Sequence, residues 1–141
     1  MQYPKKSWLA TPEPDLHVSE ATLQEAVNDY LAGRSLRSIR IPDGVFRWVQ
    51  FNAPARFRMW FNHVFGGLPD NLVLVPIPDT PYCLALCLEL KTEKGRLHGR
   101  QKSEARKNNW TVARSLDEAV SAVERAERTA QTFMQRASAV R

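Results

Sequence analysis

The sequence has few cysteines and no long hydrophobic segment. Cys83 and Cys87 are its only cysteines, and their placement on one face of the same predicted strand does not allow a well-formed disulfide. Without paired histidines nearby they are also a weak zinc motif, so we expect buried, reduced thiols. No apolar run approaches the roughly 20 residues of a membrane helix, and residues 1–18 lack the apolar segment of a secretory signal. These absences together predict a cytoplasmic protein.

Two further absences narrow the chemistry. The sequence contains neither GxGxxG nor GxxxxGK[ST], so nucleotide binding by a phosphate-cradling glycine loop has no support. It also offers no recognisable Ser-His-Asp or Cys-His arrangement, which leaves a metal-free hydrolase without candidate residues.

The composition is that of one globular domain with an excess of basic charge. The chain has 141 residues, of which 43% are hydrophobic and 25% charged, and its net charge is +5. Seven lysines and arginines lie from Lys91 to Lys107, against two acidic residues. A basic balance weakly favours a polyanionic partner, and the concentration of charge in this segment indicates where such a partner would bind.

Hydrophobic periodicity and cap residues predict an α/β protein with a central mixed β-sheet flanked by helices. Residues 1–18 hold three prolines and no period, so we expect an irregular arm there and a single domain over residues 19–141. Ser19 is a candidate N-cap for the first helix, and Ser115 with Glu118 forms a capping box before the last. The expected helices span 19–33, 54–63, 99–109 and 115–140, the expected strands 36–41, 45–52, 72–75, 82–91 and 110–115, and a turn is expected at 42–44.

The strand over residues 82–91 ends in two charged residues. Alternate residues share a strand face, so a row of leucines is expected to pack against a helix. Glu89 and Lys91 then stand together at the end of the other row, about 7 Å apart. If residues 72–75 pair with this strand as a hairpin, Asp70 lies beside them. Two carboxylates and one ammonium group are then expected at one end of the sheet.

Two carboxylates that can share one ion suit Mg²⁺ or Mn²⁺, which retain waters and accept a phosphate oxygen. A neighbouring lysine stabilises anionic charge or orients a water, and this combination suits phosphodiester hydrolysis. A Glu-x-Lys pair by itself is more often an ordinary surface ion pair, which contributes little stability. The Gly-x-Pro-Asp sequence upstream and the basic segment downstream favour the functional interpretation.

The order of these motifs resembles the VRR-NUC (virus-type replication-repair nuclease) family of the PD-(D/E)xK superfamily. The resemblance covers about residues 19–123 and is carried by GGLPDNLVLVP, CLELKTEKGRLHGRQ and WTVARSLDEAVSAV. It implies a restriction-endonuclease-like core in which Asp70 and Glu89 bind the metal and Lys91 is the catalytic lysine. The remaining site residues that it implies are Gln101 on the following helix, the Leu90 carbonyl as a metal ligand, and Glu20 of the EATLQ sequence as a further catalytic and metal-binding acid.

Two positions depart from the family pattern. Asp43 stands where asparagine is usual in an Ile-Pro-Asn-Gly turn, and we expect it to form the turn rather than to bind metal. The segment His98-Gly99-Arg100 replaces the more usual serine and proline, which affects the entry to the following helix. His98 by itself is expected to contact solvent or phosphate.

Seven aromatic residues lie from Phe46 to Phe65, interleaved with three arginines. Core packing would take most of them, and the helical spacing of Phe57, Trp60 and Phe61 indicates one buried face. A homodimer interface is the second interpretation, because stand-alone members of the resembled family are thought to act as dimers. Base stacking, with the arginines on phosphates, is the third.

We therefore expect a Mg²⁺- or Mn²⁺-dependent DNA endonuclease that cuts branched or structured DNA, such as four-way junctions, as a homodimer. With no separate DNA-binding domain visible, shape-guided cutting is favoured over sequence-specific cutting. The alternative is a catalytically inactive DNA-binding or interaction module with the same nuclease fold. Contacts to the DNA backbone are expected from the basic segment, namely from Lys94, Arg96, Arg100, Lys102 and Arg106.

Overall fold

The computed structural model describes residues 19–92, 95–97 and 99–140 and confirms an α/β protein. Within these residues the helices are α1 (Glu20–Gly33), α2 (Asp43–Asn52), α3 (Ala55–Phe65), α4 (Gly99–Asn108) and α5 (Leu116–Ala139). The strands are β1 (Arg37–Ile39), β2 (Asn71–Pro76), β3 (Cys83–Leu90) and β4 (Thr111–Ala113). The expected arm over residues 1–18 lies outside the described residues, as do Lys94 and His98. None of the described helices has the length and apolar character needed to cross a membrane.

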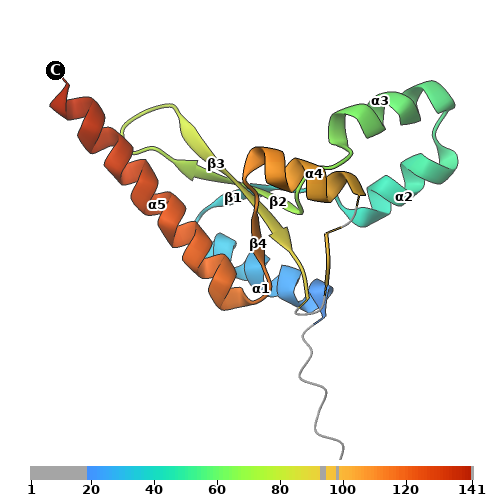
Figure 1. The fold of residues 1–141 in the computed structure, drawn as a ribbon, viewed down its shortest axis with the longest axis horizontal. Helices are drawn as coiled ribbons and strands as arrows, with labels where there is room; N and C mark the ends of the chain where they lie inside the picture. The colour runs from blue at the N-terminus through green and yellow to red at the C-terminus, as the bar shows by residue number, and fades with distance from the viewer. Residues whose placement is uncertain (1–18, 93–94, 98, 141) are drawn as a thin grey trace, which may run out of the picture.

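The described strands form one mixed sheet in the order β1-β2-β3-β4. β1 and β2 are antiparallel, β2 and β3 form the expected antiparallel hairpin, and β3 and β4 are parallel. The parallel pair needs a crossover connection, and α4 lies within it. Figure 1 shows α5 running along the sheet and past it, with α2 and α3 standing as a pair on the other side of the molecule.

The two faces of the sheet have different roles. One face carries the leucine row of β3, in which Leu88 and Leu90 are fully buried, and packs against α1 and α5 as predicted. Val27 of α1 and Val123 of α5 belong to the same cluster of buried side chains. The opposite face carries Glu89 and lies beneath α4. The polar site and the main hydrophobic core are therefore separated by the sheet.

The β2–β3 hairpin confirms the adjacency predicted from the strand spacing. Asn71, at the start of β2, pairs with Leu88 of β3. Asp70 precedes Asn71, and because the strands are antiparallel it lies beside the residues that follow Leu88. The chain thus places Asp70 next to Glu89.

A double-glycine turn leads the chain from α3 into this hairpin. Gly67 has φ of +77°, a left-handed conformation that glycine adopts without the steric cost of a side chain. A Cβ atom at Gly66 would lie 2.3 Å from the carbonyl oxygen of Asn62, so the helix end leaves no room for one. The helix ends at Phe65, two residues beyond the predicted end, and the turn directs Pro69-Asp70 into the sheet.

The segment after β1 differs from the prediction. Pro42 is the N-cap of α2 and Asp43 lies in its first turn, where a carboxylate interacts favourably with the helix dipole, so the expected turn at 42–44 is wrong. Residues 45–52 form a helix and not a strand. The reason is tertiary: Val49 faces α3 and joins a small buried cluster with Phe61.

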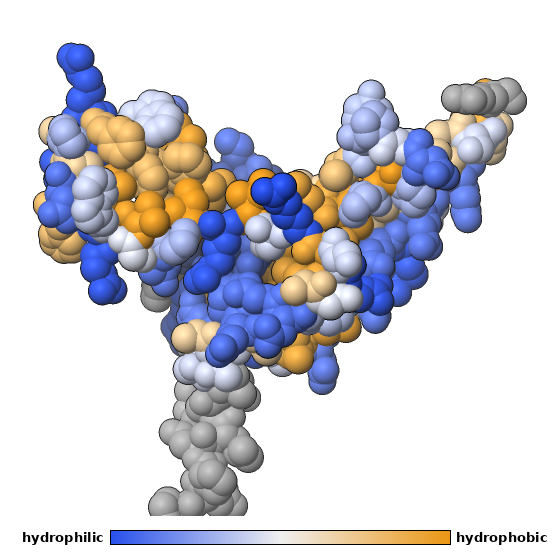
Figure 2. All heavy atoms as spheres, turned by 180° about the vertical axis from the view of Figure 1, so that it is seen from behind, coloured by the Kyte–Doolittle hydropathy of each residue, from blue (hydrophilic) through white to orange (hydrophobic). Residues whose placement is uncertain are grey.

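Most of the aromatic side chains between residues 46 and 65 lie on the surface, which contradicts the core interpretation. Phe61 is buried, and Phe46 and Phe65 are partly buried against it. The buried face expected from helical spacing is therefore wrong for Phe57 and Trp60, which are 44% and 54% exposed. Figure 2 shows hydrophobic residues gathered over α2 and α3. The exposed ones are Val45, Trp48, Phe51, Phe57, Met59, Trp60 and Val64, which we call the α2–α3 apolar face.

No disulfide joins Cys83 and Cys87, and the expectation that both thiols are buried is wrong. Cys83 is exposed at the start of β3, and Cys87 is partly buried. Both side chains project from the face opposite the leucine row. That face has only partial cover, because α4 lies over the Cys87 end of β3 and leaves the other end open.

Candidate functional site

Asp70 and Glu89 are held together by hydrogen bonds that cross between β2 and β3. The backbone N–H of Asp70 donates to Oε2 of Glu89 at 3.0 Å. In return, the backbone N–H of Leu90 donates to Oδ2 of Asp70 at 2.8 Å. Each carboxylate is therefore oriented by the neighbouring strand, and the two acids are fixed relative to each other by the hairpin itself.

Three further residues predicted from the sequence reach the same place from other elements. Nζ of Lys91 lies 3.2 Å from Oε1 of Glu89 and 3.8 Å from Oε1 of Glu20 at the start of α1. Nε2 of Gln101, in the first turns of α4, donates to Oε1 of Glu89 at 3.0 Å. The structure thus brings together Asp70, Glu89, Lys91 and Gln101, with Glu20 reaching the group through Lys91.

Burial raises the pKa values of both acids. Glu89 is fully buried, and its pKa is raised first by loss of solvation and next by the negative charge of Asp70. The pKa of Asp70 is raised by desolvation, while the hydrogen bond from Leu90 and the charges of Lys91 and Arg40 oppose that rise. Two acids with raised pKa values at one site are a common feature of functional centres. The excess negative charge would favour binding of a cation.

The donor set fits a hard divalent cation. In the described part of the chain no group of three or more His, Cys, Asp or Glu side chains has the spacing of a metal site. However, Mg²⁺ is commonly bound by only one or two carboxylates, with waters and substrate phosphate completing its shell. Oδ2 of Asp70 accepts the Leu90 hydrogen bond, and among the described residues no hydrogen bond reaches its Oδ1. That oxygen is available to a ligand.

The Leu90 carbonyl lies on the appropriate side of β3 to contribute. In an extended strand the N–H and C=O of one residue point to the same side, and the N–H of Leu90 points to Asp70. The next amide, that of Lys91, turns the other way and donates to the carbonyl of Ala113 on β4. The predicted carbonyl ligand therefore faces the side on which Asp70 lies.

A buried amide network on the opposite face of the sheet supports the hairpin at the same point. Gln24 of α1 and Asn71 exchange two hydrogen bonds, at 3.0 and 3.1 Å, and both side chains are buried. Ser38 of β1 donates to Asn71 as well. Neither Gln24 nor Asn71 was assigned a role from the sequence. The sequence feature that could have identified Asn71 is its position as the one amide in the otherwise apolar row Asn71, Val73, Val75.

The residues predicted to contact DNA lie along α4 and before it. Lys102 and Arg106 are exposed one turn apart and line a shallow groove with Lys107. Arg100 is exposed, but its Nη1 donates to the carbonyl oxygen of Asn62 at 3.0 Å and so connects α4 to α3. Arg96 is exposed in the segment before α4, and Lys94 lies outside the described residues.

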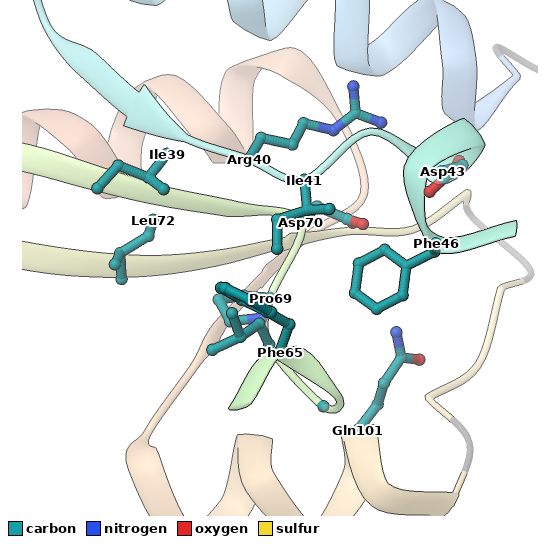
Figure 3. A pocket seen from close by; sticks show the side chains of 12 residues that line it. Ile39, Arg40, Ile41, Asp43, Phe46, Phe65, Pro69, Asp70, Leu72 and Gln101 are labelled. Atoms are coloured by element: carbon teal, nitrogen blue, oxygen red, sulfur yellow. The ribbon is translucent and has the colours of Figure 1, made fainter. Parts of the chain in front are cut away.

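A cavity of about 290 Å³ opens directly beside Asp70. Figure 3 shows the Asp70 carboxylate, the Phe46 ring and the Gln101 amide pointing toward one another across it. Ile39 of β1 and Leu72 of β2 form its other wall. This cavity was not predicted from the sequence, because it forms where α2 meets the end of the sheet and α2 was expected to be a strand.

Comparison with protein-family models, curated proteins and solved structures found no significant match to the chain.

Proposed function

We propose that this protein is a divalent-metal-dependent DNA endonuclease with a PD-(D/E)xK core of the VRR-NUC type, over residues 19–141. The observation that carries the proposal is the pair of acids, Asp70 and Glu89, that the hairpin holds side by side with Lys91 on the Glu89 carboxylate. The pKa values of both buried acids remain raised despite the charges of Lys91 and Arg40, so the pair is electrostatically unfavourable unless a further cation joins it. A bound metal ion would offset the repulsion between the two carboxylates and would explain why the fold holds them together.

Asp70 and Glu89, with the Leu90 carbonyl, would hold a Mg²⁺ or Mn²⁺ ion. When bound, such an ion would supply Lewis-acid activation of a water and neutralise charge on the phosphate. Glu20 would add a fourth oxygen only by leaving Lys91, from which it now lies 3.8 Å away. We therefore assign Glu20 chiefly to orienting Lys91.

Lys91 would carry the cationic part of the chemistry. Its side chain is only 12% exposed, so its charge acts through a poorly solvated environment and is weakly screened. From there the ammonium group would stabilise negative charge that develops on a phosphate bound at Asp70. Gln101 holds Oε1 of Glu89 from the α4 side and would keep this carboxylate oriented during the reaction.

The exposed basic residues of α4 support DNA as the substrate. Lys102 and Arg106 belong to α4, the helix that also carries Gln101, and α4 lies on the same side of the sheet as Glu89. Such charges bind phosphates without reading base sequence. We extend the proposal to branched or structured DNA, because backbone contacts of this kind follow the shape of the DNA and do not select a base sequence.

The α2–α3 apolar face supports a homodimer. An exposed apolar area of this kind is uncommon on a monomer and usually marks an interaction surface. Dimerisation would bring a second catalytic centre to a two-fold symmetric branch. A second copy of the chain is the partner that we propose for this face.

The proposal is tested by incubating the purified protein with plasmid and with synthetic branched DNA in Mg²⁺, in Mn²⁺ or in EDTA. Metal-dependent cutting that disappears in the Asp70→Asn variant is the expected result. If no substrate is cut in either metal while branched DNA is still bound in EDTA, the inactive DNA-binding module is the correct function instead.

A further inference from the structure

The cavity beside Asp70 has the properties of a site for a single unpaired nucleobase. Its volume of about 290 Å³ is near the lower end of the roughly 300–1,000 Å³ found for small-ligand pockets. Its lining is mainly apolar, with Phe46 and Phe65 on one side and Ile39 and Leu72 on the other. A flat aromatic ligand fits this lining better than a phosphate or a sugar would.

The aromatic wall is fixed in place before any ligand arrives. The ring of Phe61, which is buried, lies 5.1 Å from that of Phe46 and 4.9 Å from that of Phe65, measured between centroids. Both cavity-lining rings are only partly buried, so each retains an open surface. Side chains held in this way can stack on a base with little loss of conformational entropy.

The polar part of the cavity lining carries charges of both signs, from Asp43, Asp70 and Arg40. Asp43 lies at the rim, in the first turn of α2. The Asp43 carboxylate can accept a hydrogen bond from a base amino group, and the Arg40 guanidinium beside it can bind a phosphate. Asp70 and Gln101 form the other part of the rim and belong to the proposed catalytic centre. A base and its own phosphate are joined by one sugar, so both can be held at once.

We infer that the cavity between α2 and the end of the sheet binds the base of an unpaired nucleotide next to the phosphodiester that is cut. This inference rests on the proposed nuclease function and adds a substrate class to it. A base in a Watson–Crick pair is stacked within the duplex and cannot enter the cavity. The site therefore selects DNA with an unpaired or extruded nucleotide, such as a bulge or the branch point of a junction.

The first arm of the test measures binding without cleavage. A duplex with one unpaired 2-aminopurine is titrated with the full-length protein in EDTA, and the fluorescence of the analogue is followed. We expect a saturable change that is weakened about tenfold or more by Ile39→Trp, which fills the cavity from β1, on the scale of one lost base–aromatic stack. Val140→Trp adds similar bulk at the exposed end of α5, outside the cavity lining, and should leave the titration unchanged.

The second arm measures cleavage of bulged duplexes in which the unpaired nucleotide carries a base or is abasic. We expect the abasic duplex to be cut about tenfold more slowly. Equal rates for the two duplexes overturn the base site and leave the nuclease proposal intact. If neither duplex is cut in any metal, the nuclease proposal fails, and the titration alone decides the cavity: a signal insensitive to Ile39→Trp overturns the base site.

Discussion

The backbone N–H of Asp70 donates a hydrogen bond of 3.0 Å to the carboxylate of Glu89. The same carboxylate is fully buried and lies close enough to Asp70 for the charge of Asp70 to raise its pKa. The fold therefore brings two acids together where each would be more stable apart. Such a pair lowers the stability of the folded chain at neutral pH and increases its affinity for a cation, and the first two predictions follow from this relationship.

Asp70→Asn should abolish cleavage and stabilise the fold. Asparagine can keep the hydrogen bond from Leu90 while removing one negative charge, so we expect cutting to fall by at least about 100-fold, the scale of losing one electrostatic group at a reacting centre. The Tm in EDTA at pH 7 should rise. Because burial raises the pKa of Asp70, its favourable contribution is complete below the unfolded pKa, near 4, and is lost as the pH rises through the folded pKa. The difference in Tm should therefore vanish in acid.

The same variant provides the metal control. Mg²⁺ or Mn²⁺ should raise the Tm of the parent at pH 7, because a ligand that binds only the folded state stabilises it. The Tm of Asp70→Asn should not respond to either ion. A parent protein whose Tm is the same with metal and with EDTA would argue against the assigned ligand pair.

Lys91→Met should have the opposite effect on stability. It removes the cation that lies 3.2 Å from the buried carboxylate of Glu89, and breaking one half of a buried ion pair costs roughly 3–5 kcal/mol. Denaturant titration at pH 7 should show this loss. The loss should be smaller at pH 4, where Glu89, with its raised pKa, is protonated more readily. Cleavage should also be lost, so Lys91→Met and Asp70→Asn share an activity defect but differ in the sign of their stability change.

The amide pair beneath the hairpin should behave as one unit. Gln24→Leu or Asn71→Leu alone leaves a buried amide without its partner, which costs roughly 1–3 kcal/mol. In the double variant neither amide of the pair remains, so its free energy of unfolding should be higher than the two single changes predict when added. Denaturant titration of the four proteins measures this coupling. Purely additive changes would mean that the two hydrogen bonds contribute little to stability.

Loss of one exposed phenylalanine from the α2–α3 apolar face should produce monomers. Phe51 is 81% exposed, so Phe51→Ser should leave the Tm of an isolated chain nearly unchanged while weakening self-association. Sedimentation equilibrium of parent and variant measures the effect. Phe133→Ser on α5, where the side chain is 57% exposed, is the matched control and should remain dimeric. A parent that sediments as a monomer would contradict the assigned partner.

Charge reversal on α4 should weaken DNA binding without changing the acid pair. For Lys102→Glu with Arg106→Glu we expect lower affinity for branched DNA in EDTA and a salt dependence reduced by about 1 unit of slope for each lost phosphate contact. Arg125→Glu with Arg128→Glu makes the same charge change on α5 and should have a much smaller effect. Equal losses from both pairs would indicate attraction by net charge and not a binding surface.

The hairpin that carries the two acids could be predicted from the sequence, because it depends only on interactions between residues that are close together in the chain. Strand alternation fixes which side chains share a face, and a short connection between two strands favours an antiparallel pair, so Asp70 and Glu89 could be placed together before the structure was known. The resemblance to a nuclease family then added Gln101, 12 residues after Glu89, and Glu20, which lies far upstream in the chain. Both reach the Glu89–Lys91 pair in the structure.

The segment over residues 42–65 could not be predicted in the same way. Its valines and aromatic residues have a high intrinsic preference for strands, but Val49 is buried by contact with α3, a tertiary effect that propensity does not contain. The exposure of Trp48 and Phe51 was also not predictable. Hydrophobic residues that pack inside the fold and those that pack against a partner are of the same residue types, so the sequence does not distinguish them. The cavity lined by Phe46 forms where α2 meets the end of the sheet, so it was missed together with this helix.

The tip of the β2–β3 hairpin lies at the opposite end of these strands from the acid pair. β2 spans Asn71–Pro76, which at about 3.3 Å per residue separates the tip from Asp70 by roughly 20 Å. The tip is closed by its own hydrogen bonds, from Thr80 to the Ile77 carbonyl and from Ile77 to the Tyr82 carbonyl, and Asp79 there adopts a φ of 58°. A fluorescent tag or a DNA-targeting domain inserted at Asp79 would therefore be carried on a rigid hairpin. Its two ends would lie close together, and the end of the sheet that carries Asp70 and Glu89 would stay open.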